Sequence, residues 1–352
     1  MVVEFSMQGT ILNHRQRCGI SETIKQKKLN FLSHNYTMSC NFILQCGKNK
    51  GKQCSLKGKL LLSTKMYCTR HYKSQQGSEK PSLSVSVVGF DIIREIGKGA
   101  FGRVALIQDS DTQEYYAIKI TSNKIKKEAD LLYYEYLLLS QHFADNNAFP
   151  RLLPKVAKSY KRTEKETYLI MEHFEETLYQ RFLKSNKQFS EGQIRSYGLQ
   201  ILNIIEYIHS KKHLYIDIKP ENFMFKTEDD ESIKIIDFGL CQRYVDYEGK
   251  HIKSNALSNP IGTDFYSSVR MMKCEQPGRI DDIECIGYLL LYLYAGELSW
   301  SKASSAEEIL TIKQDSMFLD APEYIKSFIM SIRGHSFDSK PDYDQFKEFL
   351  TT

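Results

Sequence analysis

The stretch KHLYIDIKPENF, residues 212–223, places an acid, an amine and an amide directly behind an apolar run. Pro220 removes a backbone hydrogen-bond donor and biases the residue before it towards extended geometry, so a helix does not continue through this segment. Apolar side chains alternate with the polar ones and predict a loop held by buried flanks. A loop that presents Asp217, Lys219 and Asn222 together is a candidate catalytic loop, and the alternative is an ordinary charged turn.

Length and composition indicate a large intracellular protein. The 352 residues exceed the usual size of one domain, and 41% hydrophobic with 26% charged residues is typical of a soluble globular chain. The longest apolar run, IGYLLLYLYAG at 286–296, is shorter than the roughly 18 residues that span a bilayer. The N-terminus lacks a basic start followed by an apolar core, so no secretory signal is expected. We expect a cytoplasmic protein with no membrane partner; a nuclear or virion-associated location is the alternative.

Charge and cysteine content divide the chain into two regions. Residues 1–84 carry fourteen Lys and Arg against three Asp and Glu, a net charge of +11, whereas residues 85–352 carry thirty-four against forty, a net charge of −6. Five of the eight cysteines also lie in the first region. The polar stretch SQQGSEKPSLS at 74–84 is typical of a linker. The sequence therefore predicts an extension over 1–35, a small module over 36–75, a linker over 76–86 and a large domain over 87–352.

The small module contains cysteine and histidine at spacings that suit a metal site. A short segment with few large apolar side chains needs another source of stability, and in a reducing compartment a metal is more plausible than a disulfide. Cys68 and His71 are three residues apart, and Cys40 and Cys54 flank a glycine-containing turn. These four side chains predict a tetrahedral structural Zn²⁺ site. Cys46 in place of Cys40 is one alternative, and free buried thiols are another.

The basic charge of this region also raises nucleic acid as a partner, because lysines neutralise phosphates. The lysines are equally typical of a solvated turn, and Phe42, Tyr67 and Tyr72 supply few rings for base stacking. Nucleic-acid binding is therefore the less favoured function of the module. Its turn, G-K-x-x-G-x-x-C at 47–54, resembles small cysteine/histidine modules found in proteins of large DNA viruses.

The large region opens with a glycine-rich pair of strands. Residues 89–120 read GFDIIREIGKGAFGRVALIQDSDTQEYYAIKI, with β-branched residues around Gly97, Gly99 and Gly102. A lone G-x-G-x-x-G also occurs in dinucleotide-binding folds, but there the glycines open a helix. Here the chain continues as a strand, which predicts a β-hairpin that can close over phosphates. The run AIK at 117–119 belongs to the next strand and ends on a lysine.

Further recognisable segments follow along the chain. ADLLYYEYLLLSQHF at 129–143 predicts a helix that carries Glu135, with Glu128 as a competing partner for the lysine. TYLIMEHF at 167–174 predicts a strand that ends in a polar turn. SEGQIRSYGLQILNIIEYIHSKK at 190–212 opens with a capping box from Ser190 to Gln193 and continues as a one-faced helix. SIKIIDFGL at 232–240 places an Asp-Phe-Gly run at the end of another strand.

This ordered set resembles the eukaryotic protein kinases over residues 87–352. The resemblance implies an α+β, bilobal kinase fold, with a small β-rich N-terminal lobe and a large helical C-terminal lobe. It implies that Asp217 accepts the proton of a substrate hydroxyl while Lys219 neutralises the transferring phosphate. Asn222 and Asp237 are the implied ligands of Mg²⁺.

The resemblance also assigns an ATP site. Lys119, fixed by Glu135, is the implied partner of the α- and β-phosphates, the glycine hairpin covers the phosphates, and the turn after 167–174 is the hinge that binds adenine through its backbone. The implied nucleotide-binding residues are Ile96, Gly97, Lys98, Gly99, Ala100, Phe101, Gly102, Arg103, Val104, Ala117, Lys119, Met171, Glu172, Phe174, Met224 and Ile236.

Two C-terminal segments narrow the resemblance to the casein kinase I group. GRIDDIECIGYLLLYLYAGELSW at 278–300 looks like the D-D-x-E-x-x-G-Y segment of that group, and HSFDSKPDYDQF at 335–346 matches its F-D-x-K-P-D-Y ending. NPIGTDFYSSV stands where most kinases have Ala-Pro-Glu. The vaccinia-related kinases belong to the same group, so a viral relative is implied. Residues 283–295, apolar on nearly every side, predict the buried central helix of the large lobe.

Three residues depart from the family pattern. Tyr215 stands where the family usually has histidine, and its ring can still pack against Phe238. Ile216 replaces an arginine that many kinases neutralise with an activation-loop phosphate, so control by loop phosphorylation is not expected. Phe265 replaces an arginine with which casein kinase I reads acidic or phosphorylated substrates, so that preference is not carried over.

The function implied by the resemblance is an ATP-dependent serine/threonine protein kinase that acts on protein substrates. Lys219 within KPEN and Thr263 within GT point to serine or threonine rather than tyrosine as the acceptor. A pseudokinase scaffold is the first alternative, but such proteins usually lack one of the Lys, Asp, Asn and Asp set and none is missing here. A nucleic-acid-binding zinc module with a secondary kinase domain is the second alternative.

Overall fold

The computed structural model describes residues 60–62, 65–67, 87–99, 102–124, 126–153, 158–315, 318 and 320–351. The chain divides into two compact units, Met1–Lys80 and Pro81–Thr352. In the first unit, strands β1 (Leu60–Leu62) and β2 (Lys65–Tyr67) pair antiparallel. The predicted extension, the predicted linker and the zinc ligands Cys40, Cys54, Cys68 and His71 lie outside the described residues. No helix within the described residues is long and apolar enough to cross a membrane.

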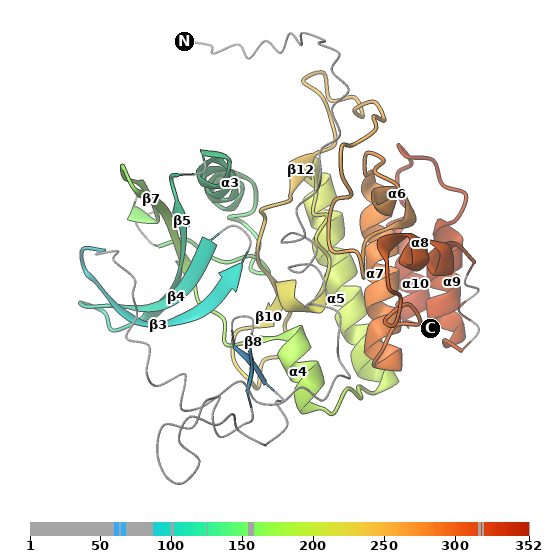
Figure 1. Cartoon of the computed structure of the whole chain (residues 1–352), viewed down its shortest axis with the longest axis horizontal. Coiled ribbons are helices and arrows are strands. Elements are labelled where there is room, and N and C mark those ends of the chain that lie inside the picture. The colour runs from blue at the N-terminus through green and yellow to red at the C-terminus, as the bar shows by residue number, and fades with distance from the viewer. Residues whose placement is uncertain are drawn as a thin grey trace. The chain divides into compact units, whose positions relative to one another are not determined.

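The second unit begins with a five-stranded antiparallel sheet (Figure 1). Its strands, in spatial order, are β3 (Phe90–Gly99), β4 (Gly102–Asp109), β5 (Tyr115–Ser122), β7 (Glu166–Glu172) and β6 (Tyr160–Arg162). Side chains alternate between the two faces of a strand. The side chains on one face of the sheet therefore form a small hydrophobic core, which contains Ala105, Ile107, Ile118, Ile120 and Ile170. The other face carries the half-buried Val104, Ala117 and Lys119.

The helix α3 (Lys126–Leu137) follows β5 and packs against β5 and β7. The sequence predicts one helix over 129–143, whereas the regular helix ends at Leu137. The next five residues, Leu138–His142, form a π-helical turn, η1. This wider turn is followed by Phe143, whose ring stacks on Phe149 with centroids 4.5 Å apart.

The remainder of the unit is a helical lobe. Its helices are α4 (Leu178–Lys184), α5 (Glu191–Ser210), α6 (Val269–Met272), α7 (Arg279–Ala295), α8 (Ala306–Asp315), α9 (Glu323–Ile332) and α10 (Tyr343–Thr351). The predicted capping box of α5 is confirmed: the Ser190 hydroxyl accepts from the Gln193 N–H, and the Gln193 side chain accepts from the Ser190 N–H. The apolar positions predicted for α5 are all buried, namely Ile194, Tyr197, Ile201, Leu202, Ile205 and Ile208.

Helix α7 is the centre of this lobe and packs against α5 and α9 (Figure 1). Most of its residues are buried, as predicted for 283–295, and only its last turn opens to solvent, where Tyr294 is 45% exposed. The α5–α7 contact requires a glycine at one point. A Cβ added at Gly198 would lie 2.6 Å from Leu290 Cδ2, closer than packed carbon atoms approach. The two helices therefore approach each other closely at this point.

Short strands hold the segment 212–223, which contains the candidate catalytic loop. Strand β9 (His213–Leu214) pairs with β12 (Gln242–Arg243), and β10 (Phe223–Phe225) lies between β8 (Glu176–Thr177) and β11 (Lys234–Ile235). The predicted buried flanks of the loop are confirmed at Leu214, Ile216, Ile218 and Phe223. Pro220–Asn222 forms one turn of 3-10 helix, η3, because proline is tolerated in a first helical turn.

Candidate active site

The loop at 215–222 is held by a buried acid on α7. Asp282 accepts hydrogen bonds from the backbone N–H groups of Tyr215 and Ile216, both at 2.8 Å, and lies 2.9 Å from His209 Nε2 on α5. Ile216 has a φ of +75°, which a β-branched residue adopts only under strain. The bonds to Asp282 and the burial of the Ile216 side chain hold this conformation. The position of the following residue, Asp217, is thereby fixed to the core of the large lobe.

Three side chains converge on the carboxylate of Asp217. Lys219 Nζ lies 2.5 Å and Asn222 Nδ2 lies 3.0 Å from its Oδ2, and the Thr263 hydroxyl donates to its Oδ1 at 2.8 Å. The Asn222 amide also donates to the Asp217 carbonyl oxygen at 2.8 Å. Asp217 is 8% exposed. The structure thus brings together the three residues that the loop sequence singled out and gives the carboxylate one orientation, as a positioned base requires.

Lys119 on β5 connects acids from the two lobes. Its Nζ lies 2.7 Å from Glu135 Oε2 on α3 and 2.9 Å from Asp237 Oδ1. Burial opposes the charge of Lys119, but the carboxylates of Glu135 and Asp237 outweigh it and raise the pKa of the amine. The competing acid Glu128 instead accepts a hydrogen bond from Thr121 Oγ1 at 3.2 Å. Lys119 therefore stays charged at neutral pH and is available to neutralise phosphate oxygens.

Asp237 and Asn222 offer the hard oxygen atoms that Mg²⁺ prefers. The Asp237 side chain is 35% exposed, and although burial acts in the opposite direction, the Lys119 ammonium lowers the pKa of Asp237. The Asn222 amide nitrogen is committed to Asp217, which leaves its carbonyl oxygen for a cation. The Ile236 N–H donates to the Asn222 backbone carbonyl at 3.0 Å and ties the two segments together. The donor set fits the predicted Mg²⁺ role.

The described residues contain no group of three or more His, Cys, Asp and Glu side chains that could hold a metal ion. A Mg²⁺ ion at Asn222 and Asp237 would therefore complete its shell with phosphate oxygens and water, which is how Mg²⁺ is usually bound in phosphoryl-transfer sites. The predicted zinc ligands of the N-terminal module are not among these residues.

The glycine hairpin consists of β3 and β4, with Gly97 opposite Val104 and Gly99 opposite Gly102. Gly102 has a φ of +138°, and a Cβ added there would lie 2.2 Å from the Ile120 carbonyl oxygen. Only glycine fits this position, because both the backbone angle and the neighbouring strand exclude a side chain. Lys98 and Arg103 pair in the same register. The predicted residues Ala100 and Phe101, at the tip of the hairpin, lie outside the described residues.

The predicted adenine-contacting residues come from both lobes. Ala117 is opposite Met171 in the sheet, and Met171 and Phe174 are buried at the end of β7. Ile96 on β3 is half-buried on the small-lobe side. The half-buried residues contributed by the large lobe are Met224 on β10 and Ile236 next to the Asp-Phe-Gly run.

The side chain of Glu172 in the hinge is already occupied. It accepts from Arg151 Nε at 3.2 Å and from Lys226 Nζ at 2.9 Å, and the Glu172 backbone N–H donates to the Arg151 carbonyl oxygen at 2.8 Å. A cavity of about 480 Å³ opens beside the hinge. Sequence motifs did not single out its lining, which consists of Arg94, Leu106, Tyr115, His173, Glu175, Lys226 and Thr227.

Tyr215 takes part in positioning the Asp-Phe-Gly run. Its hydroxyl donates to the Ile236 carbonyl oxygen at 2.6 Å, and its ring meets Phe238 edge-on with centroids 5.9 Å apart. The neighbouring Ile216 is 1% exposed and belongs to the core of the large lobe. The two residues that depart from the family pattern in this loop are therefore both accommodated by packing.

The segment 263–268, called the acceptor loop below, is anchored by Lys313 on α8. Lys313 is 0% exposed, and its Nζ donates to the carbonyl oxygens of Asp264 at 2.8 Å and Ser267 at 2.7 Å. Burial lowers the pKa of Lys313 to about 7. The ammonium also lies 4.6 Å from the ring centre of Tyr288 and 5.0 Å from that of Trp300, and aromatic faces attract a cation. Lys313 thus fixes the backbone of the loop that contacts Asp217.

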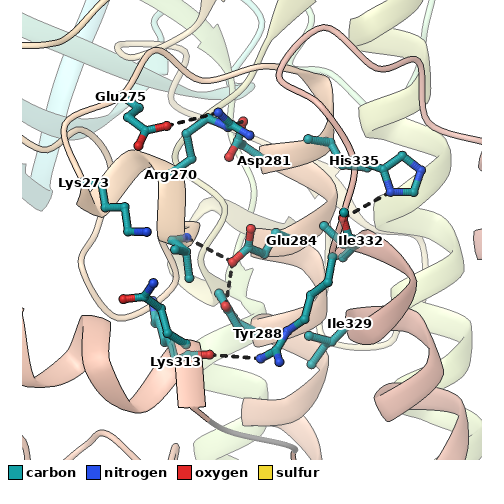
Figure 2. A pocket seen from close by; sticks show the side chains of 15 residues that line it. Arg270, Lys273, Glu275, Asp281, Glu284, Tyr288, Lys313, Ile329, Ile332 and His335 are labelled. Atoms are coloured by element: carbon teal, nitrogen blue, oxygen red, sulfur yellow. Dashed lines mark hydrogen bonds and ion pairs between the residues drawn. The ribbon is translucent and has the colours of Figure 1, made fainter.

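Behind the acceptor loop is a cavity of about 330 Å³, lined by residues of α6, α7, α8 and α9 (Figure 2). Glu284 accepts there from the Val269 N–H at 3.0 Å and from the Tyr288 hydroxyl at 2.6 Å. Arg270 lies 3.1 Å from Glu275 and 3.4 Å from Asp281. Neither Asp217 nor Lys119 lines this cavity, so its charged groups support the loop from behind and stand apart from the reacting atoms.

Comparison with known proteins agrees with this geometry. The protein kinase domain model matches residues 90–344. A probable casein kinase I homolog of Encephalitozoon cuniculi (strain GB-M1) is 30% identical over 276 residues, which cover 75% of this chain and 84% of the relative. A second probable casein kinase I homolog of the same organism is 24% identical over 283 residues, 76% of this chain and 90% of that relative. The resemblance to viral proteins stays a prediction. The chain therefore belongs to the protein kinase family of transferases and is casein kinase I-like.

Proposed function

We propose that this protein kinase is ATP-dependent and transfers the γ-phosphate to serine or threonine hydroxyls of proteins. The observation that carries the proposal is the bond from the Thr263 hydroxyl to Asp217 Oδ1, with Lys219 Nζ on the other carboxylate oxygen. A serine or threonine hydroxyl ends a short side chain, so its peptide backbone must run close to the base. An acceptor loop bonded directly to Asp217 supports such an approach.

Each group then has one task in the transfer. Asp217 orients the acceptor hydroxyl and takes its proton as the new O–P bond forms and the bond to the departing ADP oxygen breaks. Lys219 neutralises the transferring phosphate, and Lys119 neutralises the phosphates that leave. Asn222 and Asp237 would hold Mg²⁺, which would supply further positive charge at the phosphates. Because phosphoryl transfer needs little covalent help from the protein, this positioning and charge account for most of the catalysis.

A pseudokinase scaffold is the alternative from another class of function. Such a protein would bind partners through the kinase fold without transferring phosphate. The ion pair of Lys119 with Glu135 and the buried contacts of Asp217 favour the active enzyme, because these charges are placed where phosphate and acceptor would meet.

Incubation of the full chain with [γ-³²P]ATP, Mg²⁺ and uncharged peptides that contain a single Ser, Thr or Tyr tests the proposal. We expect label on the Ser and Thr peptides. Asp217→Asn should lower kcat by about 10²-fold or more while ATP affinity is kept, since a positioned base typically supplies 10²–10⁴. Unchanged turnover in Asp217→Asn would refute the base, label on the Tyr peptide alone would refute the acceptor, and ATP binding without transfer would establish the pseudokinase.

For the N-terminal module we propose a structural Zn²⁺ site at Cys40, Cys54, Cys68 and His71, supported by their spacing. Metal analysis should give close to one zinc per chain. Because ligand binding in such modules supplies about 10 kcal/mol of folding free energy, Cys54→Ala should release the metal and expose the module to protease. Cys46→Ser should retain zinc if Cys40 is the fourth ligand. A metal-free chain with a protease-resistant N-terminus would refute the site.

A further inference from the structure

A buried chain of hydrogen bonds runs from the C-terminal helix to the loop that carries Asp217. Tyr343, the first residue of α10, lies with its hydroxyl 2.7 Å from His209 Nδ1, in the last turn of α5. The other ring nitrogen, His209 Nε2, lies 2.9 Å from Asp282 Oδ2 on α7. Tyr343, His209 and Asp282 are all buried, with 8% or less of each exposed. Asp282 binds the N–H groups of the two residues before Asp217, so the chain ends at the base.

The two ends of this chain fix which ring nitrogen of His209 carries its proton. Each carboxylate oxygen of Asp282 already accepts a backbone N–H, from Tyr215 at Oδ2 and from Ile216 at Oδ1. A carboxylate only accepts, so the ring proton is assigned to Nε2, which donates to Oδ2. Nδ1 is then an acceptor and receives the Tyr343 hydroxyl proton. Among the described residues this hydroxyl has no other hydrogen-bond partner, so a second ring proton on Nδ1 would leave it without an acceptor.

The loop needs this anchor because its backbone is strained. Ile216 is β-branched and has a φ of +75°, a conformation that persists only when the surroundings enforce it. The bonds to Asp282 enforce it while the carboxylate keeps one orientation. Without the Tyr343 hydroxyl, the imidazole of His209 can take the other tautomer, in which the lone pair of Nε2 faces the carboxylate and repels it. The orientation of Asp282 therefore depends on a hydroxyl on α10.

A second contact between α10 and α5 lies outside this chain of hydrogen bonds. Both α7 and α10 pack against α5 (Figure 1). One turn beyond Tyr343, Lys347 Nζ lies 2.6 Å from Glu206 Oε2 on α5. This ion pair docks the helix without contacting the imidazole of His209. The docking of α10 and the support of Asp217 can therefore be broken separately.

We propose that Tyr343 is a positioning residue for the phosphoryl transfer: its hydroxyl fixes the tautomer of His209 and thereby the loop that aims Asp217. The inference rests on the proposed kinase activity. It gives a task to the tyrosine that ends the segment FDSKPDY at 337–343, which in the sequence serves only as a mark of the family resemblance. Because Tyr343 acts on the base through two other side chains, its loss should slow the transfer and leave the binding of ATP and peptide in place.

Tyr343→Phe tests the proposal, since it removes the hydroxyl and keeps the ring. The assay uses the full chain, [γ-³²P]ATP, Mg²⁺ and the uncharged peptide with a single Ser. We expect kcat to fall about 5- to 10-fold, the effect of one hydrogen bond on a rate. The KM for ATP and the KM for peptide should each stay within about twofold, because a displaced base affects the transfer and not the binding.

Two matched variants separate this effect from the packing of the helices. Tyr324→Phe removes a hydroxyl in α9 that is also buried but has no hydrogen-bond partner among the described residues. Lys347→Met breaks the ion pair between α10 and α5 and leaves His209 untouched. Both variants should keep kcat within about twofold of the wild type.

A double-mutant cycle with His209→Gln shows whether Tyr343 acts through the imidazole. If it does, adding Tyr343→Phe to His209→Gln should change kcat by less than about twofold, because the group on which the hydroxyl acts is already gone. If His209→Gln does not fold, the comparison of Tyr343→Phe with Lys347→Met still decides.

The outcomes separate this inference from the kinase assignment. If the peptide is phosphorylated in an Asp217-dependent manner and Tyr343→Phe keeps its kcat, the inference fails and the kinase function stands. An equal fall in kcat for Tyr343→Phe and Lys347→Met would refute it as well, since the docking of α10 would account for both. Independent effects of Tyr343→Phe and His209→Gln in the cycle would refute the path through the imidazole. If no peptide is phosphorylated while ATP binds, the proposed function fails and the inference falls with it.

Discussion

The nucleotide side and the acceptor side of this active site are built from different kinds of contact. On the nucleotide side, charged side chains meet directly, with Lys119 2.7 Å from Glu135 and 2.9 Å from Asp237. On the acceptor side, Lys219 contacts Asp217, but the acceptor loop is held by the buried Lys313, which binds main-chain carbonyl oxygens, and the residue beside the base, Ile216, is apolar. The nucleotide side holds charged side chains in position, whereas the acceptor side holds the main chain of the acceptor loop in position.

The difference follows from what each side has to bind. The triphosphate and its metal present the same charges in every turnover, so a rigid set of opposite charges suits them. In the proposed function, the acceptor loop meets peptides of different sequence. Lys313 anchors this loop through main-chain oxygens, which every side chain leaves in place. Breaking each kind of contact should therefore give a distinct kinetic signature.

The largest effect is expected on the nucleotide side. Asp237→Ala removes a Mg²⁺ ligand and one of the two carboxylates that hold Lys119. In the wild type, ATP with Mg²⁺ at 100-fold excess over Kd should stabilise the fold by about 2.7 kcal/mol. In Asp237→Ala the part of this stabilisation that depends on Mg²⁺ should disappear, as measured by thermal shift with and without the metal. The exposed Asp229→Ala is the matched control, and an unchanged metal response in Asp237→Ala would contradict the metal assignment.

A smaller and selective effect is expected on the acceptor side. Lys313→Met removes the donor to the Asp264 and Ser267 carbonyl oxygens but keeps an unbranched apolar chain in the core. A loosened acceptor loop should raise the KM for acceptor peptide by about tenfold, since misplacement of a bound reactant is costly. The KM for ATP should stay within about twofold, because nucleotide contacts are made elsewhere.

This variant also tests whether the two sides are independent. Two buried carbonyl groups lose their donor, so the melting temperature should fall as well, by an amount corresponding to about 1–3 kcal/mol. Lys313→Arg, which keeps the donors, should restore part of the acceptor KM. If Lys313→Met lowers the melting temperature but changes the KM for peptide and for ATP equally, Lys313 supports the lobe in general and does not position the acceptor loop.

The same contrast explains what the sequence could and could not predict. The charged residues of the site lie in short sequence motifs: the residues of 217–222 and the Asp-Phe-Gly run each occupy a few consecutive positions. The structure brings Lys119 and Glu135 together, as the resemblance implied, and adds a contact of Lys119 with Asp237 that was not predicted. The choice of Glu135 over Glu128 stayed open in the sequence and is settled by the structure, where Glu135 contacts Lys119 and Glu128 contacts Thr121.

The supports of the acceptor side could not be predicted in this way. Lys313 binds carbonyl groups 46 and 49 positions earlier in the chain, and Asp282 binds amides 66 and 67 positions earlier. Such contacts arise from the packing of α7 and α8, and a single lysine in AEEILTIKQD has no local pattern that marks it.

The smallest expected effect concerns regulation. Many kinases with an arginine in the position of Ile216 need a phosphate on the activation segment to neutralise that arginine. Here Ile216 is buried in the core, and Gln242 on β12, which lies opposite Leu214 of β9, is uncharged. No cation at these two positions is left unpaired when the phosphate is absent. Protein treated with phosphatase should therefore keep its kcat/KM for acceptor peptide within about twofold, a change below that of a typical exposed ion pair.

The measurement needs proof that the phosphate is gone. Mass spectrometry of the 241–263 segment before and after treatment supplies it, and a mock-treated sample corrects for losses during handling. Ile216→Arg sharpens the comparison: the new guanidinium would enter the core without a partner, and a buried unpaired charge destabilises by about 3–5 kcal/mol. Its melting temperature should fall far more than that of Ile216→Leu, which keeps the apolar contact. If the wild-type enzyme loses most of its activity when the phosphate is removed, the acceptor side is held by charge. The contrast between the two sides would then no longer stand.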